Sequence, residues 1–371
     1  MVNAMKHATI AEIDHNALRH NFNLITERTG RPVIAVVKAD AYGHGAVPVA
    51  RTLCDAGARW LAVATPNEAL ELRDAGIDHP VLLFGAHHPS YFPDLINRDI
   101  LLTVHDSNSL RAISRAARQI ETRAHVHLCI DSGMHRAGVL SAAALSLLDE
   151  AARTEAVSVS GLYTHFSSAD EEDPAYTHKQ LALFRPVEKA ARQRFPDLHV
   201  HMANSAAVMR FPQSHADAVR PGIMLYGNLP APDFATDWPL REAMTLKSNV
   251  GLIKKVPADS AVSYNRRYTT TRPTRLAVVP AGYADGMPRA MTGQAQVLIN
   301  GCRFPVAGTI TMDQIIVDVG NAPVREGDEV VFFGAQGKAF LSINEWAKWA
   351  GTISYEITCG ISRRVKRRHH L

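Results

Sequence analysis

Short apolar runs alternate with amphipathic stretches along the first two thirds of the chain. The runs are rich in Val, Ile and Leu, and they cover residues 32–38, 60–65, 80–85, 100–105, 123–130, 158–166, 198–203 and 218–225. The stretches between them place apolar residues at helical spacing, and several end in Gly. Continuous apolar strands alternating with helices are typical of a parallel sheet covered on both faces. We therefore predict a (β/α)8 barrel over residues 12–238, with a doubly wound open sheet as the alternative.

The pattern changes at about residue 240. Strand-like segments joined by turn residues follow one another, with one helical patch at 342–351, which predicts a mainly β domain over residues 239–371. The opening segment HATIAEID alternates in the manner of a strand. We predict that residues 1–11 form a strand that pairs with this second domain. The fold class is thus α/β, a barrel followed by a mainly β C-terminal domain.

Composition and charge exclude several classes of protein. Apolar residues make up 46% of the chain and charged residues 20%, which is the balance of an ordinary globular protein. The net charge of +4 comes from the C-terminal segment, whose five basic residues are Arg363, Arg364, Lys366, Arg367 and Arg368. Without them 35 basic residues face 36 acidic ones, so a nucleic-acid partner is not supported. We expect this basic segment to be a solvated end.

Cysteine usage and hydropathy bear on the cellular location. The four cysteines are far apart and form no CxxC pair, which fits neither a disulfide framework nor a cysteine zinc site. No stretch reaches the roughly 18 apolar residues of a membrane span, and the N-terminus has no uninterrupted apolar core of a signal peptide. These features predict a cytoplasmic protein without a membrane partner.

Lys38 ends the apolar run VIAVVK, at the strand edge where barrels place their functional groups. A desolvated amine has a lowered pKa and becomes a Schiff-base nucleophile, whereas a structural ion pair at the barrel rim is the alternative. Two HVH pairs, at 125–127 and 199–201, could point to a metal. The first pair lies before the end of its strand, so we expect core histidines and no metal.

The run AVVKADAYGHG at 35–45 resembles the cofactor-attachment segment of alanine racemases. Eight further segments resemble that family in the family's order: DSGMHRAG, THFSSAD, ANSAA, RPGIMLYG, VSYNRRY, GYADG, TMDQ and SYEITCGIS. The resemblance spans nearly the whole chain. It implies a pyridoxal 5'-phosphate enzyme that interconverts L- and D-alanine and supplies D-alanine for peptidoglycan.

The resemblance also implies roles for individual residues. The cofactor phosphate would be held by Tyr42, Ser205, Gly222, Ile223 and Tyr355. Arg220 would donate to the pyridine nitrogen of the cofactor, and because a guanidinium cannot accept a proton it would leave that nitrogen unprotonated. An arginine paired with a carboxylate at the rim is the alternative for Arg220.

Racemisation requires a base on each face of the α-carbon. By resemblance these bases are Lys38, which also binds the cofactor, and Tyr264, which in the family reaches the active site of the partner subunit in a homodimer. His165, which we also place at the cofactor, and nearby arginines would favour the phenolate of Tyr264. The resemblance places Arg136, Tyr283, Met312 and Asp313 at the substrate.

The chain departs from the family pattern at Cys129, where many members have a lysine that is often carbamylated. The negative charge that would pair with Arg136 is then missing. Since an uncompensated buried guanidinium is costly, we expect a bound chloride near Cys129 and Arg136, with an ionised thiolate as the weaker option. Lesser departures are Asn265, where glycine is common, and Lys366, where proline is common.

Four other functions are alternatives to an alanine racemase, and most would show a different sequence feature or property. A broad-specificity amino-acid racemase of the same fold is the nearest alternative. A pyridoxal-phosphate-dependent barrel decarboxylase would have a glycine-rich phosphate loop and a cysteine in place of Tyr264. A single-domain carrier of the cofactor would lack the β domain, and a metal hydrolase would bind metal.

Overall fold

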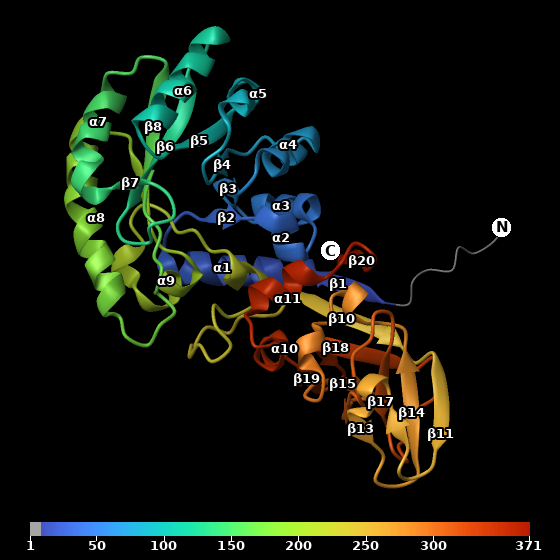
Figure 1. Ribbon diagram of the computed structural model, residues 1–371. Coiled ribbons are helices and arrows are strands. Elements are labelled where there is room, and N and C mark those ends of the chain that lie inside the picture. Colours follow the sequence, from blue (N-terminus) through green and yellow to red (C-terminus); the bar gives the residue numbers. More distant parts are fainter. Residues whose placement is uncertain (1–8) are drawn as a thin grey trace, which may run out of the picture. The chain divides into compact units, whose positions relative to one another are not determined.

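A computed structural model describes residues 9–371 and divides the chain into two compact units. The barrel unit comprises residues 19–225 and 236–239, and the β unit comprises residues 9–18, 226–235 and 240–371 of the described chain. Both units are shown in Figure 1.

The barrel unit is built on parallel strands that follow one another in chain order. The strands are β2 (Ile34–Val36), β3 (Trp60–Val63), β4 (Val81–Leu83), β5 (Ile100–Val104), β6 (Ala124–Asp131), β8 (Val157–Tyr163) and β9 (His199–His201). A two-residue strand β7 (Val139–Leu140) pairs with β6 outside this path. The strands are short and buried because both of their faces are covered.

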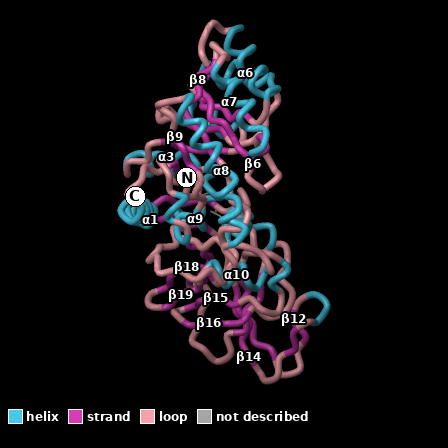
Figure 2. The backbone as a smooth tube through the Cα atoms, turned by 90° about the vertical axis from the view of Figure 1, so that its left-hand side faces the viewer, coloured by secondary structure: helices cyan, strands magenta, loops and turns pink. Residues whose placement is uncertain are grey.

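Helices cover the outside of these strands (Figure 1, Figure 2). They are α1 (His15–Thr29), α3 (Ala46–Asp55), α4 (Pro66–Asp74), α5 (Phe92–Asn97), α6 (Ser107–Gln119), α7 (Ala144–Ala152), α8 (Ala175–Arg194) and α9 (Ser205–Arg210). The segment α2 (Lys38–Gly43) follows β2 and has left-handed backbone. Thr65 and Asp106 cap α4 and α6 with their side chains, which begins each helix directly after a strand and its loop.

Residues 217–221 close the ring. Val219 N donates to Pro32 O at 3.0 Å on one side, and Arg220 N donates to Ala203 O at 2.9 Å on the other. This closure confirms the barrel and excludes the open sheet. The predicted eighth strand at 218–225 was too long, because Pro221 has no N–H to donate and Ile223–Tyr226 form a 3-10 helix.

The β unit contains one large sheet and two small ones. In the large sheet the order is β16 (Cys302–Pro305), β15 (Gln296–Ile299), β18 (Glu329–Gln336), β10 (Met244–Asn249), β1 (Ile10–Asp14) and β20 (Lys366–His370), with β19 (Ala339–Leu341) paired to β18. The small sheets are β11 (Leu252–Val256), β14 (Thr274–Val279) and β17 (Ile315–Asp318), and the pair β12 (Ala261–Val262) and β13 (Tyr268–Thr269). Two helices, α10 (Ile343–Ala350) and α11 (Ser354–Gly360), complete the unit.

The two chain ends described by the structure meet in the large sheet. β1 is antiparallel to β10 and parallel to β20, with Ile10 opposite Lys366. The basic C-terminal segment is therefore not a free end, although its residues Arg363, Arg364, Lys366 and Arg368 are exposed to solvent as expected. Arg367 donates to the carbonyls of Ile361, Ser362 and Val365, which precede β20, and Arg368 lies 3.6 Å from Glu12 of β1.

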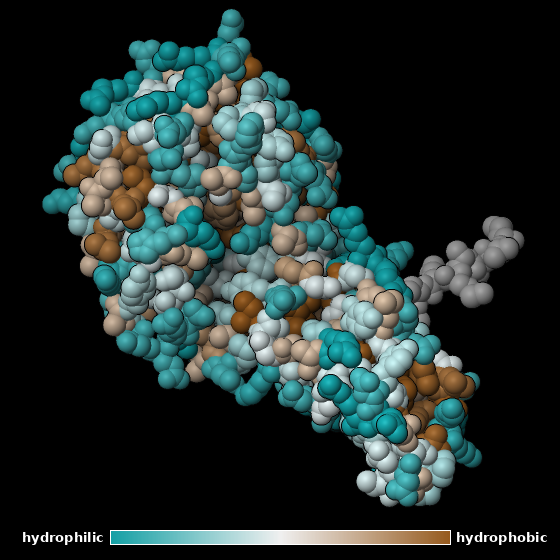
Figure 3. All heavy atoms as spheres, viewed as in Figure 1, coloured by the Kyte–Doolittle hydropathy of each residue, from teal (hydrophilic) through white to brown (hydrophobic). Residues whose placement is uncertain are grey.

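The surface and the cysteines add two observations. The face in Figure 3 is mainly hydrophilic, with hydrophobic side chains in separate patches. None of the helices within residues 9–371 has the length and hydropathy for crossing a membrane, and no metal-binding group of His, Cys, Asp and Glu side chains occurs in that range. All four cysteines are free.

Candidate active site

Lys38 begins a turn of unusual backbone conformation at the carboxyl end of β2. The four residues that follow it, 39–42, have φ between 52° and 55° and form a left-handed turn without glycine. Left-handed backbone costs roughly 1–2 kcal/mol for each residue that has a Cβ. Such strain persists only where surrounding contacts hold it, and it is concentrated at functional sites.

Hydrogen bonds on each side hold this turn. Glu68 of α4 accepts from Ala39 N at 2.7 Å with one carboxylate oxygen and from Ala64 N at 2.8 Å with the other. Asp40 accepts from Ala46 N at 2.7 Å, and the ring of His44 bonds the carbonyls of Ala41 and Tyr42. The backbone at Lys38 is thereby tied to the ends of β3 and α3.

Ser205, Gly222 and Tyr42 meet at the ends of the last two barrel strands. Ser205 Oγ accepts from Gly222 N at 2.9 Å and lies 3.4 Å from Met224 N. A Cβ at position 222 would lie 2.2 Å from Tyr42 Oη, so only glycine fits beside this tyrosine. Ile223 is completely buried next to them. Hydroxyls and backbone N–H groups thus converge, which is the arrangement that binds phosphate groups in barrels.

Arg220 is 3% exposed and points into the barrel. Its guanidinium donates to His201 Nδ1 at 2.8 Å and to the carbonyls of His201, Met202 and Thr164. None of the groups that contact Arg220 within residues 9–371 is a carboxylate, so the alternative of a rim ion pair is wrong. Burial lowers the pKa of Arg220 to about 10, which leaves it cationic at neutral pH.

A chain of neutral imidazoles extends from Arg220, and the sequence did not assign it a role. Because His201 Nδ1 accepts from Arg220, its proton is on Nε2, which lies 2.9 Å from His127 Nδ1. Burial lowers the pKa of His127 to about 3 and that of His201 well below its usual value. A Cβ on Gly161 would lie 2.4 Å from the His127 ring. His127 and His201 are core histidines as predicted, whereas His125 is exposed.

His165 links Arg220 to the other charged residues of the site. Its Nδ1 lies 3.3 Å from Arg220 Nη2. Burial, and after it the positive charges of Arg220, Arg136 and Lys38, lower the pKa of His165 well below its usual value. The barrel unit thus brings together Lys38, Tyr42, His165, Ser205, Arg220, Gly222 and Ile223, with Arg136 near His165.

The structure corrects two expectations, one about the thiol of Cys129 and one about the burial of Arg136. Its thiol is 4% exposed and burial raises its pKa to about 11, so the thiolate option is wrong. Cys129 Sγ lies 3.7 Å from Ala137 O. The side chain of Arg136 is exposed in this chain, so the reason given for a bound anion, a buried guanidinium without a counter-charge, does not hold.

Tyr264 lies on the loop between β12 and β13 in the β unit and is 69% exposed. Three residues around it have positive φ: Ser263 at 62°, Asn265 at 60° and Arg266 at 50°. Asn265 tolerates this left-handed conformation better than most residues, which explains how it can stand where glycine is common. Ser263, with ψ of −173°, lies in a region that is essentially restricted to glycine.

The other predicted residues of the β unit lie on neighbouring loops. Tyr283 N donates to Thr311 O at 3.0 Å, which places Tyr283 beside the segment of Met312. Tyr283 is 42% exposed and Met312 51%. Asp313 forms an ion pair with Arg364 at 2.9 Å, and Tyr355 lies on α11, half-buried.

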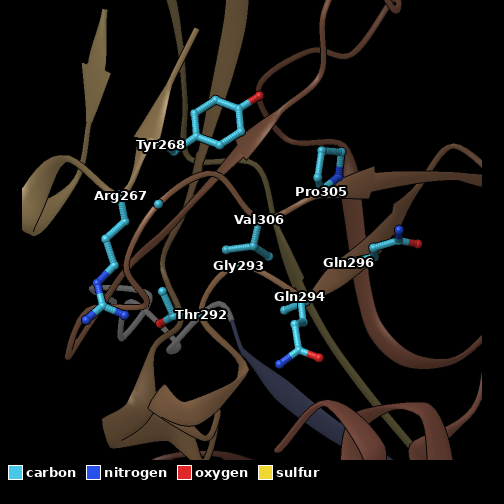
Figure 4. Close-up of a pocket in the computed structure, with 10 residues that line it drawn as sticks. Arg267, Tyr268, Thr292, Gly293, Gln294, Gln296, Pro305 and Val306 are labelled. Atoms are coloured by element: carbon cyan, nitrogen blue, oxygen red, sulfur yellow. The ribbon is translucent and has the colours of Figure 1, made fainter.

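A cavity of about 480 Å³ in the β unit lies beside the loop of Tyr264 (Figure 4). Arg267, Tyr268, Thr292, Gln294 and Gly308 are among the residues that line it. No residue of this cavity was predicted as functional. The cavity lies between two parts of the β unit, the loop of Tyr264 and the segment 292–308. The packing of these two parts determines where Tyr264 lies.

Comparisons with known proteins match both units. A family model described as "Alanine racemase, N-terminal domain" matches residues 13–230, and one described as "Alanine racemase, C-terminal domain" matches residues 243–369. The alanine racemase of Halothermothrix orenii is 42% identical over 365 residues, which are 97% of this chain and 96% of that protein. That of Symbiobacterium thermophilum is 44% identical over 363 residues, with 97% and 96% covered.

Solved structures of similar proteins have the same fold. The alanine racemase of Streptomyces lavendulae superposes with a TM-score of 0.94 at 39% identity, covering 99% of this chain and 98% of that one. The alanine racemase of Bacillus anthracis, solved with bound L-Ala-P, gives a TM-score of 0.91 at 35% identity, covering 99% and 96%.

Proposed function

The chain belongs to the alanine racemase family, and from that premise we propose that it interconverts L- and D-alanine with pyridoxal 5'-phosphate as cofactor. One observation supports the proposal above the others. Arg220 is a buried cation with neutral partners, and its charge and that of Lys38 both act on His165. A guanidinium that cannot accept a proton suits an unprotonated ring nitrogen, which favours proton return over decarboxylation.

The residues of the barrel unit fit this cofactor. Gly222 leaves the space beside Tyr42 that a Cβ would fill, and Ser205 Oγ already lies at the backbone N–H groups of Gly222 and Met224. We assign the phosphate to Tyr42, Ser205, Gly222 and Ile223, with Tyr355 as a further ligand. When bound, the chemistry this cofactor supplies is an electron sink that makes the Cα–H bond of the amino acid acidic.

Two residues of the chain move the proton. Lys38 Nζ takes or returns it on one face of the α-carbon, and Tyr264 Oη does so on the other. The fixed backbone after Lys38 holds the first base in place. Arg136, Tyr283, Met312 and Asp313 orient the substrate carboxylate and enclose it.

We propose that the enzyme is a homodimer with shared active sites. Tyr264, Tyr283 and Met312 are among the most exposed large apolar side chains of the single chain. Exposed apolar side chains of this kind mark interaction surfaces. A second copy whose barrel covers them would complete the site.

Two further parts of the proposal concern the cellular location of the reaction and the bound chloride. The reaction supplies D-alanine for peptidoglycan and takes place in the cytoplasm, where the four free cysteines stay reduced. Growth of a D-alanine auxotroph on expression of this chain tests the supply of D-alanine. Because the neutral thiol of Cys129 supplies no negative charge near Arg136, a chloride there stays part of the proposal although Arg136 is exposed, and we expect activity of dialysed enzyme to respond to chloride and not to bicarbonate. An activity independent of both ions would remove chloride from the proposal.

Borohydride reduction tests the cofactor assignment directly. The purified protein should show an absorbance band near the visible edge that borohydride abolishes, and peptide mapping should find the cofactor on Lys38. Label on any other lysine would overturn the assignment. Turnover of a panel of amino acids separates an alanine racemase from a broad-specificity racemase, and release of CO₂ would indicate a decarboxylase.

A further inference from the structure

Two hydroxyl groups connect the loop of Tyr264 to the segment of Gly308. Ser263 Oγ donates to Thr309 O at 2.7 Å, and Thr309 Oγ1 donates to Tyr264 O at 2.8 Å. Each residue therefore donates to the other segment, and the two bonds enclose the peptide between Ser263 and Tyr264. We call this pair of bonds the Ser263–Thr309 clasp.

The loop needs such bonds because the sheet does not supply them. β12 and β13 pair only at Ala261 with Thr269 and at Val262 with Tyr268. Residues 263–267 lie beyond this ladder, and three of them have positive φ. A loop that is strained and has no cross-strand bonds would relax toward ordinary φ values, which would turn the Tyr264 side chain away from its present direction.

The segment on the other side of the clasp is well anchored. Thr309 is 3% exposed. Ala307 N donates to Ile316 O of β17 at 2.7 Å, and Ile310 N donates to Thr292 Oγ1 at 3.3 Å. The clasp therefore joins a strained loop to a rigid support.

Gly308 shows how closely the two segments approach. A Cβ at this position would lie 2.6 Å from Val262 O and 2.8 Å from Ser263 Cβ. Figure 4 shows the cavity that begins next to this contact, lined by Arg267 and Thr292. Space is thus available beside the loop, and the clasp keeps the loop from moving into it.

We propose that Ser263 and Thr309 are positioning residues that fix the direction of the Tyr264 side chain for proton transfer. The proposal rests on the proposed function of Tyr264 as a base. The Thr309 hydroxyl acts on the backbone of Tyr264, and the Ser263 hydroxyl acts on the backbone of Thr309.

Hydrogen exchange of the isolated enzyme tests the clasp without any turnover. Thr309→Val removes the hydroxyl and keeps the shape of the side chain, whereas Thr309→Ser keeps the hydroxyl. We expect Thr309→Val to accelerate amide exchange in residues 263–268 by about tenfold, and Thr309→Ser to leave it close to the wild-type rate. Thr270→Val is the matched control, since buried Thr270 donates to Pro257 O at 2.8 Å and accepts from Ser260 N at 3.0 Å, both outside residues 263–268.

Isotope effects test the consequence for catalysis. Thr309→Val should lower kcat by about 10-fold to 10²-fold. With α-deuterated alanine, the isotope effect should rise for the enantiomer whose proton goes to Tyr264 and fall for the other enantiomer, because only one of the two transfers becomes slower. Thr309→Ser should restore both values, and Thr270→Val should change neither.

The outcomes separate the two proposals. If Thr309→Val leaves exchange unchanged, or lowers kcat without opposite changes in the two isotope effects, the clasp is not a positioning device. That conclusion holds while Tyr264→Phe is inactive. If Tyr264→Phe is fully active, the role of Tyr264 as a base fails and the positioning proposal fails with it.

Discussion

The two units supply site residues in opposite states. In the barrel unit Tyr42, Ser205, Arg220 and Ile223 are at most 5% exposed and are held by contacts within the unit. In the β unit Tyr264, Tyr283 and Met312 are between 42% and 69% exposed. Each set has one member at a stretch of positive φ: Tyr42 within residues 39–42, and Tyr264 between Ser263 and Asn265.

This difference in exposure separates the part of the site that one chain can form from the part that needs a second copy. A buried cation and the groups around Gly222 need no second copy of the chain, so one chain would supply the residues of the proposed cofactor site. An exposed tyrosine and methionine require a surface that covers them before they can act on a substrate without water. The comparison thus supports a cofactor site within one chain and a second base that acts after assembly.

The largest expected effect separates the two bases. Lys38→Ala and Tyr264→Phe should each reduce racemisation in both directions by at least ~10²–10⁴-fold, the usual contribution of a general acid or base. Tyr264→Phe should keep the cofactor band, because the phenol of Tyr264 is not among the groups proposed to bind the cofactor, whereas Lys38→Ala should lose the borohydride-reducible link. Absorbance spectra and rates with both enantiomers check this. Loss of the band in Tyr264→Phe would contradict the separation.

A smaller effect is expected from filling the phosphate cradle. Gly222→Ala places a Cβ 2.2 Å from Tyr42 Oη and should weaken cofactor affinity by about 10-fold to 10²-fold, roughly 1.4–2.7 kcal/mol. Tyr42→Phe in the same chain removes the nearest atom and should recover part of the affinity. Gly360→Ala, where a Cβ meets nothing within 4 Å, is the control. Equal affinity in Gly222→Ala and Gly360→Ala would show that the cradle does not bind the phosphate.

The smallest effect concerns pH, because the units should respond in opposite directions. Burial raises the pKa of Glu242, in the β unit, to about 7. The folded β unit therefore loses stability as the pH rises from about 4.5 through 7, because the buried carboxyl group must then ionise. Burial lowers the pKa of His127, in the barrel unit, to about 3, so the barrel loses stability as the pH falls below about 6.5.

Glu242→Gln tests the first half of this contrast. Glutamine keeps an acceptor for Ser342 Oγ and Ile343 N and removes the cost of a buried charge, on the order of 2–3 kcal/mol. We expect Tm at pH 8 to rise by several degrees, and Tm at pH 5 to change little. An equal change at both pH values would mean that the carboxyl group does not titrate as stated.

The sequence predicted the parts of the site that depend on local rules. Strand ends in a barrel lie at one edge, so Lys38 could be placed there from periodicity alone, whereas Gly222 was named by the resemblance. The barrel and the β domain were predicted correctly, and the family assignment is confirmed.

The remaining features depend on contacts between residues far apart in the sequence. His127 and His201 were treated as filling the core, because nothing in HVH shows that their rings would meet each other and Arg220. The position of the basic C-terminal segment beside β1 follows from pairing across the whole chain. The exposure of Arg136 could not be read from its motif, and neither could the positive φ of Ser263.

A mixture of two inactive variants tests the central claim that the two bases come from different copies of the chain. Lys38→Ala and Tyr264→Phe chains, mixed in equal amounts with verified subunit exchange, form half their dimers as heterodimers. If Tyr264 acts in the partner's site, each heterodimer has one site with both lesions and one with neither, so the mixture should regain roughly a quarter of the wild-type activity. If Tyr264 acts within its own chain, every site retains a lesion and no activity returns, which would contradict the account.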